Sequence, residues 1–82
     1  MDRKEILGYL KEMLQLIKPS LDLSMVNEDT QLVSDLGLDS LTILLLGLAI
    51  ENKFGSRVNI MGGALEFNTV GDVIDYITQA TT

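Results

Sequence analysis

The sequence predicts an all-α fold, a small antiparallel four-helix bundle with three main helices and one short helix. Three segments carry apolar residues at helical spacing, and no strand-like alternation extends beyond residues 56–60. A long connection separates the first two segments, and 82 residues allow only one hydrophobic core. We therefore expect residues 1–82 to form a single domain, which looks free-standing because it begins at Met1 and lacks linker-like ends.

The first helix is predicted between Asp2 and Lys18. Asp2 is a suitable N-cap with Glu5 three residues later, and Pro19 stops the helix. The apolar positions form one stripe, which we expect to be buried: Ile6, Leu7, Leu10, Met13, Leu14 and Ile17.

Residues 20–39 form a long connection with apolar anchors of its own. The residues expected to turn inward are Leu21, Leu23, Met25, Val26, Leu32, Leu36 and Leu38. Its charges are all negative, at Asp22, Glu28, Asp29, Asp35 and Asp39. A solvated loop and a role in steering partners explain these carboxylates equally well.

The second helix is predicted over residues 40–54, with a serine exposed at its first turn. Asp39 and Ser40 both suit a helix start, an uncharged run follows, and Gly55 suits a left-handed C-terminal turn. Taken alone, Ser40 is explained by helix capping.

The two sides of this helix differ in their expected surroundings. The expected core side holds Ile43, Leu46, Gly47, Ile50 and Phe54. The opposite side holds Leu41, Leu44, Leu45, Leu48, Glu51 and Asn52. We expect these four leucines to be exposed; the alternative is a second core contact with the loop or the last helix.

The last part of the chain contains the short helix and the third main helix. The short helix is expected near residues 63–67, between two irregular stretches. Thr69 is expected to cap the last helix, with Asp72 near its positive end. Its inner stripe is Val70, Val73, Ile74 and Ile77.

Composition excludes several classes of function. The chain has no Cys and no His, which rules out disulfides, thiolate nucleophiles, histidine bases and the usual zinc sites. We therefore expect that the protein is not an enzyme and has no metal site. A net charge of -6 argues against nucleic-acid binding. The longest apolar stretch is too short for a membrane span, and there is no signal peptide, so a cytoplasmic protein is expected.

The modification site of acyl carrier proteins resembles residues 35–41 (DLGLDSL) together with the Glu51 and Phe54-Gly55 that follow them. The last helix of that family resembles residues 69–77. The resemblance covers nearly the whole chain. It implies the same bundle fold and a 4'-phosphopantetheine, derived from coenzyme A, on Ser40. Its terminal thiol would carry acyl groups as thioesters. Asp39 would cap the helix or engage the transferase.

The resemblance also implies that the carrier is a monomer and that it binds several enzymes. These partners are a phosphopantetheinyl transferase and acyl-loading, condensing and tailoring enzymes. The surface expected to bind them comprises Leu41, Thr42, Leu44, Leu45, Leu48 and Glu51. Family members usually place acids where this chain has Thr42, Leu45 and Asn52. This departure favours a specialised fatty-acid, lipid or polyketide pathway over housekeeping fatty-acid synthesis, and the Asp-Ser-Leu step favours acyl over peptidyl or aminoacyl carriage.

Two questions stay open at the level of sequence. A helical docking module that is never modified would use the same leucines, with Ser40 as a simple cap. Gly47 would either allow close helix packing or leave space for an acyl chain folded back into the bundle, because a glycine inside a helix costs about 1 kcal/mol without such a gain.

Overall fold

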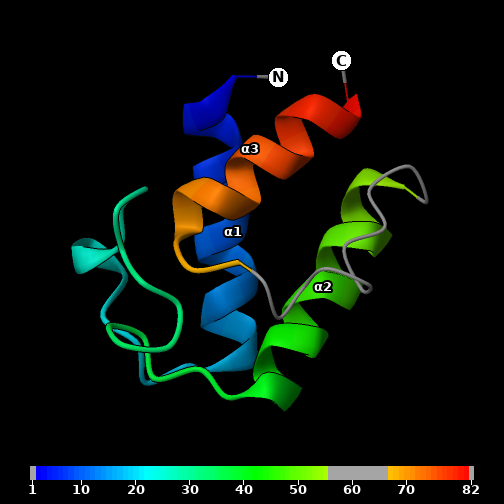
Figure 1. Cartoon of the computed structure of the whole chain (residues 1–82). Coiled ribbons are helices and arrows are strands. Elements are labelled where there is room, and N and C mark those ends of the chain that lie inside the picture. The colour runs from blue at the N-terminus through cyan, green and yellow to red at the C-terminus, as the bar shows by residue number, and fades with distance from the viewer. Residues whose placement is uncertain (1, 56–66, 82) are drawn as a thin grey trace.

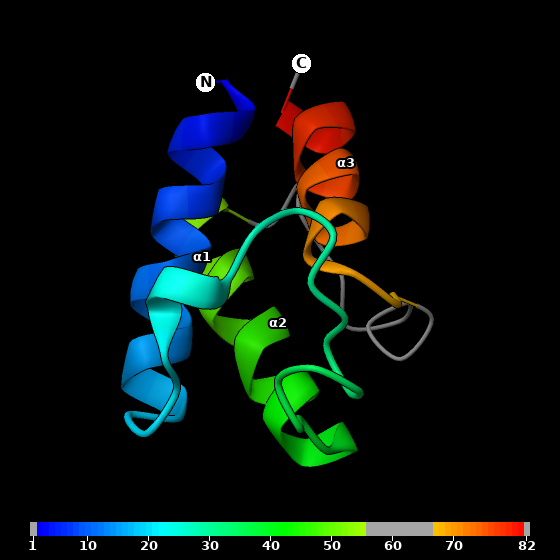
Figure 2. The same ribbon diagram turned by 90° about the vertical axis from the view of Figure 1, so that its left-hand side faces the viewer.

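The structure, a computed structural model, describes residues 2–55 and 67–81. The helices of this part are α1 (Arg3–Ile17), the 3₁₀ turn η1 (Leu23–Met25), α2 (Ser40–Phe54) and α3 (Val70–Thr81). In both ribbon views α1 runs in the direction opposite to α2 and α3, and the two chain termini lie together at one end (Figure 1, Figure 2). The predicted all-α, carrier-like helical bundle is confirmed.

One predicted element falls mostly on residues that the structure does not describe. The short helix expected at residues 63–67 lies outside the described residues, apart from Phe67, which is not helical. No helix in the described part of the chain is both long and apolar enough to cross a bilayer.

Each main helix has the predicted local stabilisation at its ends. The Asp2 carboxylate accepts a hydrogen bond from the Glu5 N–H at 2.8 Å. Thr69 and Asp72 cap α3 reciprocally, because the Thr69 hydroxyl accepts from the Asp72 N–H at 3.1 Å and the Asp72 carboxylate accepts from the Thr69 N–H at 3.0 Å. Gly55 closes α2 with a φ of 95°, a conformation that a side chain would strain.

The core lies where the apolar stripes of the three helices meet. The predicted inner stripe of α3 is fully buried, and α1 packs against both other helices. From α2, the buried residues are Ile43, Leu46, Gly47 and Ile50, as predicted, and Phe54 is half-buried with its ring edge-on to Tyr9 at 5.9 Å between centroids. The described core is therefore aliphatic with aromatic rings at its margin.

The connection between α1 and α2 is fastened to the start of α3. The Leu32 N–H donates to the Asn68 carbonyl at 2.9 Å, the Val70 N–H donates to Thr30 at 2.9 Å, and the Gly71 N–H donates to Glu28 at 2.8 Å. Figure 2 shows this connection crossing from the end of α1 past the start of α3 and back to α2.

A side-chain contact adds to this fastening. The Arg3 guanidinium of α1 pairs with both Glu28 of the connection and Asp75 of α3. The long connection is thus a packed part of the fold, as its apolar anchors predicted.

One predicted anchor of the connection is wrong. Met25 is 72% exposed, whereas Val26, Leu32, Leu36 and Leu38 are buried. In a 3₁₀ turn, residues three apart share a face, so Leu23 and Val26 can turn inward together while Met25 points elsewhere. Leu21 and Leu23 are partly buried against the core.

Gly71→Ala should destabilise the fold by about 1–3 kcal/mol. A Cβ at this position would lie 2.9 Å from the Glu28 carbonyl oxygen, the atom that accepts the Gly71 N–H bond. The connection would have to move away from α3, and urea unfolding measures the loss. The matched control is Gly8→Ala in α1, where a Cβ meets nothing within 4 Å and should stabilise by up to about 1 kcal/mol. Equal stability of the two variants would contradict the close approach.

Candidate functional site

Ser40 is the first residue of α2 and is exposed to solvent. The green ribbon of α2 begins at the end of the molecule opposite the chain termini (Figure 1). The residues before it are held in place, because the Lys18 ammonium donates to the Leu36 carbonyl at 3.0 Å and to the Gly37 carbonyl at 3.4 Å. The predicted site serine therefore stands on a fixed helix end, and its hydroxyl is accessible.

The N-cap of α2 is Asp39, not Ser40. The Asp39 carboxylate accepts hydrogen bonds from the Thr42 N–H at 2.8 Å and from the Thr42 hydroxyl at 2.7 Å. Within residues 2–55 and 67–81, the Ser40 hydroxyl makes no hydrogen bond. The interpretation of Ser40 as a simple cap is wrong, because the preceding residue already fills that role.

The electrostatic environment of this helix end combines charges of both signs. The Thr42 N–H, then the Thr42 hydroxyl, and to a smaller degree the Lys18 charge hold the pKa of the Asp39 carboxyl below its usual range. Asp39 therefore stays ionised at neutral pH. The helix start and Lys18 contribute positive potential beside it.

These surroundings fit a phosphate ester on Ser40. The Thr42 N–H is taken by Asp39 and the Ile43 N–H bonds to the Asp39 carbonyl at 3.0 Å. The Ser40 and Leu41 N–H groups come before Ile43, the first residue whose N–H bonds within the helix, so in the described structure they are available to an anion at the positive helix end. A bulky ester on this exposed oxygen would break no hydrogen bond of the described structure.

The pKa of Asp39 gives a pH-dependent prediction. A lowered folded pKa stabilises the fold above the unfolded value near 4 and loses that contribution as pH falls through the folded value. Asp39→Ala should lower the melting temperature at neutral pH, and the difference from wild type should shrink in acid. Asp39→Asn keeps a capping oxygen, so its stability at neutral pH should stay close to wild type. Thermal unfolding followed by circular dichroism across this range measures both effects; an Asn variant as unstable as the Ala variant would contradict the capping role.

The leucines of α2 are only partly exposed. Leu41, Leu45 and Leu48 are 65%, 45% and 50% exposed, but Leu44 is half-buried against the core, which corrects the expectation of four exposed leucines. On a helix each residue turns by about 100°, so Leu44 and Glu51 flank the core side while the other three leucines point away from it. We call Leu41, Leu45 and Leu48 the leucine stripe.

The other residues predicted to meet partners have mixed surroundings. Thr42 is half-buried, and its hydroxyl donates to Asp39. Glu51 is half-buried and Asn52 is exposed. The structure thus brings Ser40 and the leucine stripe together on one helix, and partner binding by these residues stays a prediction.

Most carboxylates of the connection have local structural roles. Asp22 accepts from the Ser24 hydroxyl and N–H, Asp35 accepts from the Gln31 N–H, and Glu28 pairs with Arg3. In the described part of the chain, Asp29 alone among the five carboxylates makes no such contact through its side chain. Local structure therefore accounts for four of the five carboxylates of the connection. Sequence spacing could not reveal the Glu28 contact, because Arg3 lies in α1, 25 residues earlier.

Comparisons with known proteins agree with this geometry. A sequence model of the family described as "Phosphopantetheine attachment site" matches residues 4–77. The acyl carrier protein of Thermotoga maritima is 38% identical over 78 residues, covering 94% of this chain and 93% of its own. The acyl carrier protein of Onion yellows phytoplasma is 44% identical over 63 residues, covering 76% and 80%. That of Acidothermus cellulolyticus is 33% identical over 81 residues, covering 99% and 94%.

Proposed function

The chain belongs to the phosphopantetheine-attachment family of acyl carrier proteins, and from this premise we propose that Ser40 is its attachment residue. Family membership makes the chain a carrier and not a catalyst, with a covalently attached 4'-phosphopantetheine. It also implies contact with a phosphopantetheinyl transferase and with the enzymes of a pathway.

The observation that supports Ser40 is its exposed hydroxyl, which has no hydrogen-bond partner among residues 2–55 and 67–81, next to an Asp39 that caps the helix. In the modification, the Ser40 oxygen bonds to the phosphorus that bears the pantetheine of coenzyme A. The bond from this phosphorus to the adenosine bisphosphate breaks, and the hydroxyl proton passes to the transferase. When bound, the group supplies the thiol that a chain without cysteine lacks, and a thiol with a pKa near 8.5 is a good thioester leaving group.

The neighbouring residues have separate roles in this proposal. Asp39 fixes the helix start and presents a carboxylate to the transferase and its metal. The free N–H groups of Ser40 and Leu41 stabilise the phosphate charge. Lys18 holds the loop before Ser40 through the Leu36 and Gly37 carbonyls.

The surface and the pathway follow from the composition of α2. The leucine stripe, with Glu51 at its far margin, would contact loading, condensing and tailoring enzymes through apolar side chains. Family-style docking through several helix carboxylates is not available here, which favours a specialised fatty-acid, lipid or polyketide pathway. The proposed carrier is a monomer and is located in the cytoplasm.

The second candidate is a docking module that is never modified. The exposed leucine stripe favours it, since such residues serve partner binding with or without an arm on Ser40. A peptidyl or aminoacyl carrier differs only in its cargo and would be modified in the same way.

The intact mass of the purified chain decides between the two classes. After incubation with coenzyme A and a promiscuous phosphopantetheinyl transferase, we expect an increase by one phosphopantetheine, and peptide fragmentation should place it on Ser40. An unchanged mass under conditions that modify another carrier would favour the docking module. An increase on another residue would overturn the assignment of Ser40 alone.

A further inference from the structure

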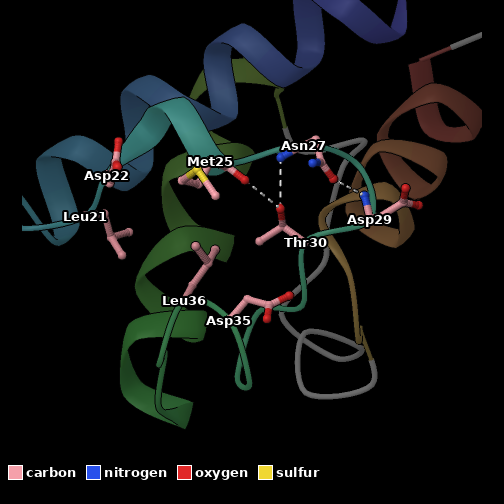
Figure 3. A pocket seen from close by; sticks show the side chains of 8 residues that line it. All are labelled: Leu21, Asp22, Met25, Asn27, Asp29, Thr30, Asp35 and Leu36. Carbon is pink, nitrogen blue, oxygen red and sulfur yellow. Dashed lines mark hydrogen bonds between the residues drawn. The ribbon is translucent and has the colours of Figure 1, made fainter.

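A cavity of about 520 Å³ opens within the connection between α1 and α2 (Figure 3). Its apolar lining comes from Leu21, Met25 and Leu36, and carboxylates at Asp22, Asp29 and Asp35 supply much of its polar lining. The volume falls in the range of small-molecule sites in proteins. An arm attached to Ser40 would be tethered four residues after Leu36, which lines this cavity.

The walls of this cavity are held by hydrogen bonds of the connection itself. The Thr30 hydroxyl accepts from the Asn27 N–H at 2.8 Å and donates to the Met25 carbonyl at 3.4 Å, and the Asn27 side-chain oxygen accepts from the Asp29 N–H at 2.8 Å (Figure 3). Thr30 is buried, with 7% of its surface exposed. The cavity is therefore formed before any ligand enters.

The lining selects an uncharged ligand that has both apolar segments and hydrogen-bond donors. Hydrogen bonds from Ser24 hold the pKa of the Asp22 carboxyl below its usual range, so this wall stays negative and repels phosphate or carboxylate. The pantetheine part of the arm carries two amide N–H groups, a hydroxyl and a pair of methyl groups. Carboxylates accept strongly from such donors, and the leucines suit the methyl groups.

Ser40 is close enough to this cavity along the chain. Leu36 precedes Ser40 by four residues, so the two Cα atoms lie at most about 14 Å apart. Lys18 holds the beginning of this stretch through the Leu36 and Gly37 carbonyls. Because the arm is tethered, even weak contacts with the cavity walls suffice to populate the bound state.

We propose that this cavity holds the pantetheine part of the arm when no partner enzyme is engaged. The arm then lies along the connection, with its phosphate at the start of α2, and is not folded back into the bundle. This inference rests on the proposed attachment at Ser40. It adds a resting site for the arm in the connection.

Nuclear magnetic resonance of the apo and phosphopantetheinylated protein tests the inference. Intact mass first verifies that the sample is modified. We then expect amide shifts at Asn27, Thr30 and Leu36, and nuclear Overhauser contacts between the arm's paired methyl groups and the methyl groups of Leu21 and Leu36.

Two matched variants make the test specific. Met25→Glu replaces one of the three apolar side chains of the lining with a charged one at an exposed edge of the cavity, so the arm's methyl groups lose an apolar partner and the shifts and methyl contacts should be lost. Leu16→Glu introduces the same side chain at a position of α1 that is 83% exposed and does not line the cavity, so the contacts should persist. Both positions are on the surface, so both variants should fold.

Several outcomes would overturn the inference. Modified protein whose shifts are confined to residues 39–42 leaves the proposed function intact and removes the resting site. Contacts to Leu46 or Ile74 would place the arm between the helices. Shifts of the cavity amides by a lysine-rich peptide but not by the arm would assign the cavity to a basic partner. If no mass increase occurs, the proposed function fails and this inference fails with it.

Discussion

Ser40→Ala should abolish phosphopantetheinylation and leave the fold almost unchanged. The substitution removes the only atom of residue 40 that can form the phosphodiester. It removes no hydrogen bond described in the structure, and Asp39 continues to cap α2. Alanine is also a better helix former than serine, so the free energy of unfolding should change by less than about 0.5 kcal/mol. Intact mass after incubation with coenzyme A and transferase measures the first effect, and urea unfolding measures the second.

The matched control is Ser34→Ala, another exposed serine in the same acidic part of the chain. It should be modified as completely as the wild type. Modification that persists in Ser40→Ala would move the attachment site elsewhere. A large loss of stability in Ser40→Ala would mean that the serine has a structural role in the start of α2.

Much of the fold could be predicted because its signals are local. Apolar spacing predicted the buried stripes of all three helices, except that Leu7, Ile17 and Phe54 at the stripe margins are only half-buried. Asp2, Thr69 and Gly55 marked helix ends by their own chemistry. Sequence reasoning misjudged the burial of residues whose exposure depends on the segments packed around them. Met25 points outward because of the 3₁₀ turn, and Leu44 is half-buried because it lies at the margin of the core side.

The candidate site could be located from the sequence but not described in detail. A motif places Ser40 at a helix start, yet the pattern Asp-Ser fits either residue as the cap, and the hydrogen bond to Thr42 was needed to choose Asp39. Lys18 beside the site could not be found from the motif, because it lies at the C-terminal cap of α1 and meets the loop only in three dimensions. The cavity has the same origin, since it exists only when the connection folds on itself.

Leu45→Glu should shorten the lifetime of complexes with pathway enzymes by tenfold or more. Leu45 lies in the middle of the leucine stripe and is 45% exposed. Full burial of an exposed leucine contributes about 1.5–3 kcal/mol, so glutamate would lose part of this amount and would also place a charge in the interface. Apolar anchors near the centre of an interface mainly control dissociation. Surface plasmon resonance with the transferase as the first partner measures the rate constants directly.

Two further variants distinguish effects on the dissociation rate of the complex from effects on its association rate. Leu16→Glu makes the same change on α1 outside the leucine stripe and should dissociate like the wild type. Asp29→Asn removes a connection charge that has no contact of its own in the described structure; it should slow association slightly and make it less sensitive to salt, because peripheral charges act on encounter. Normal dissociation of Leu45→Glu would show that partners bind another face of the carrier. Equal loss in Leu45→Glu and Leu16→Glu would mean that added negative charge, and not the lost leucine, weakens the complex.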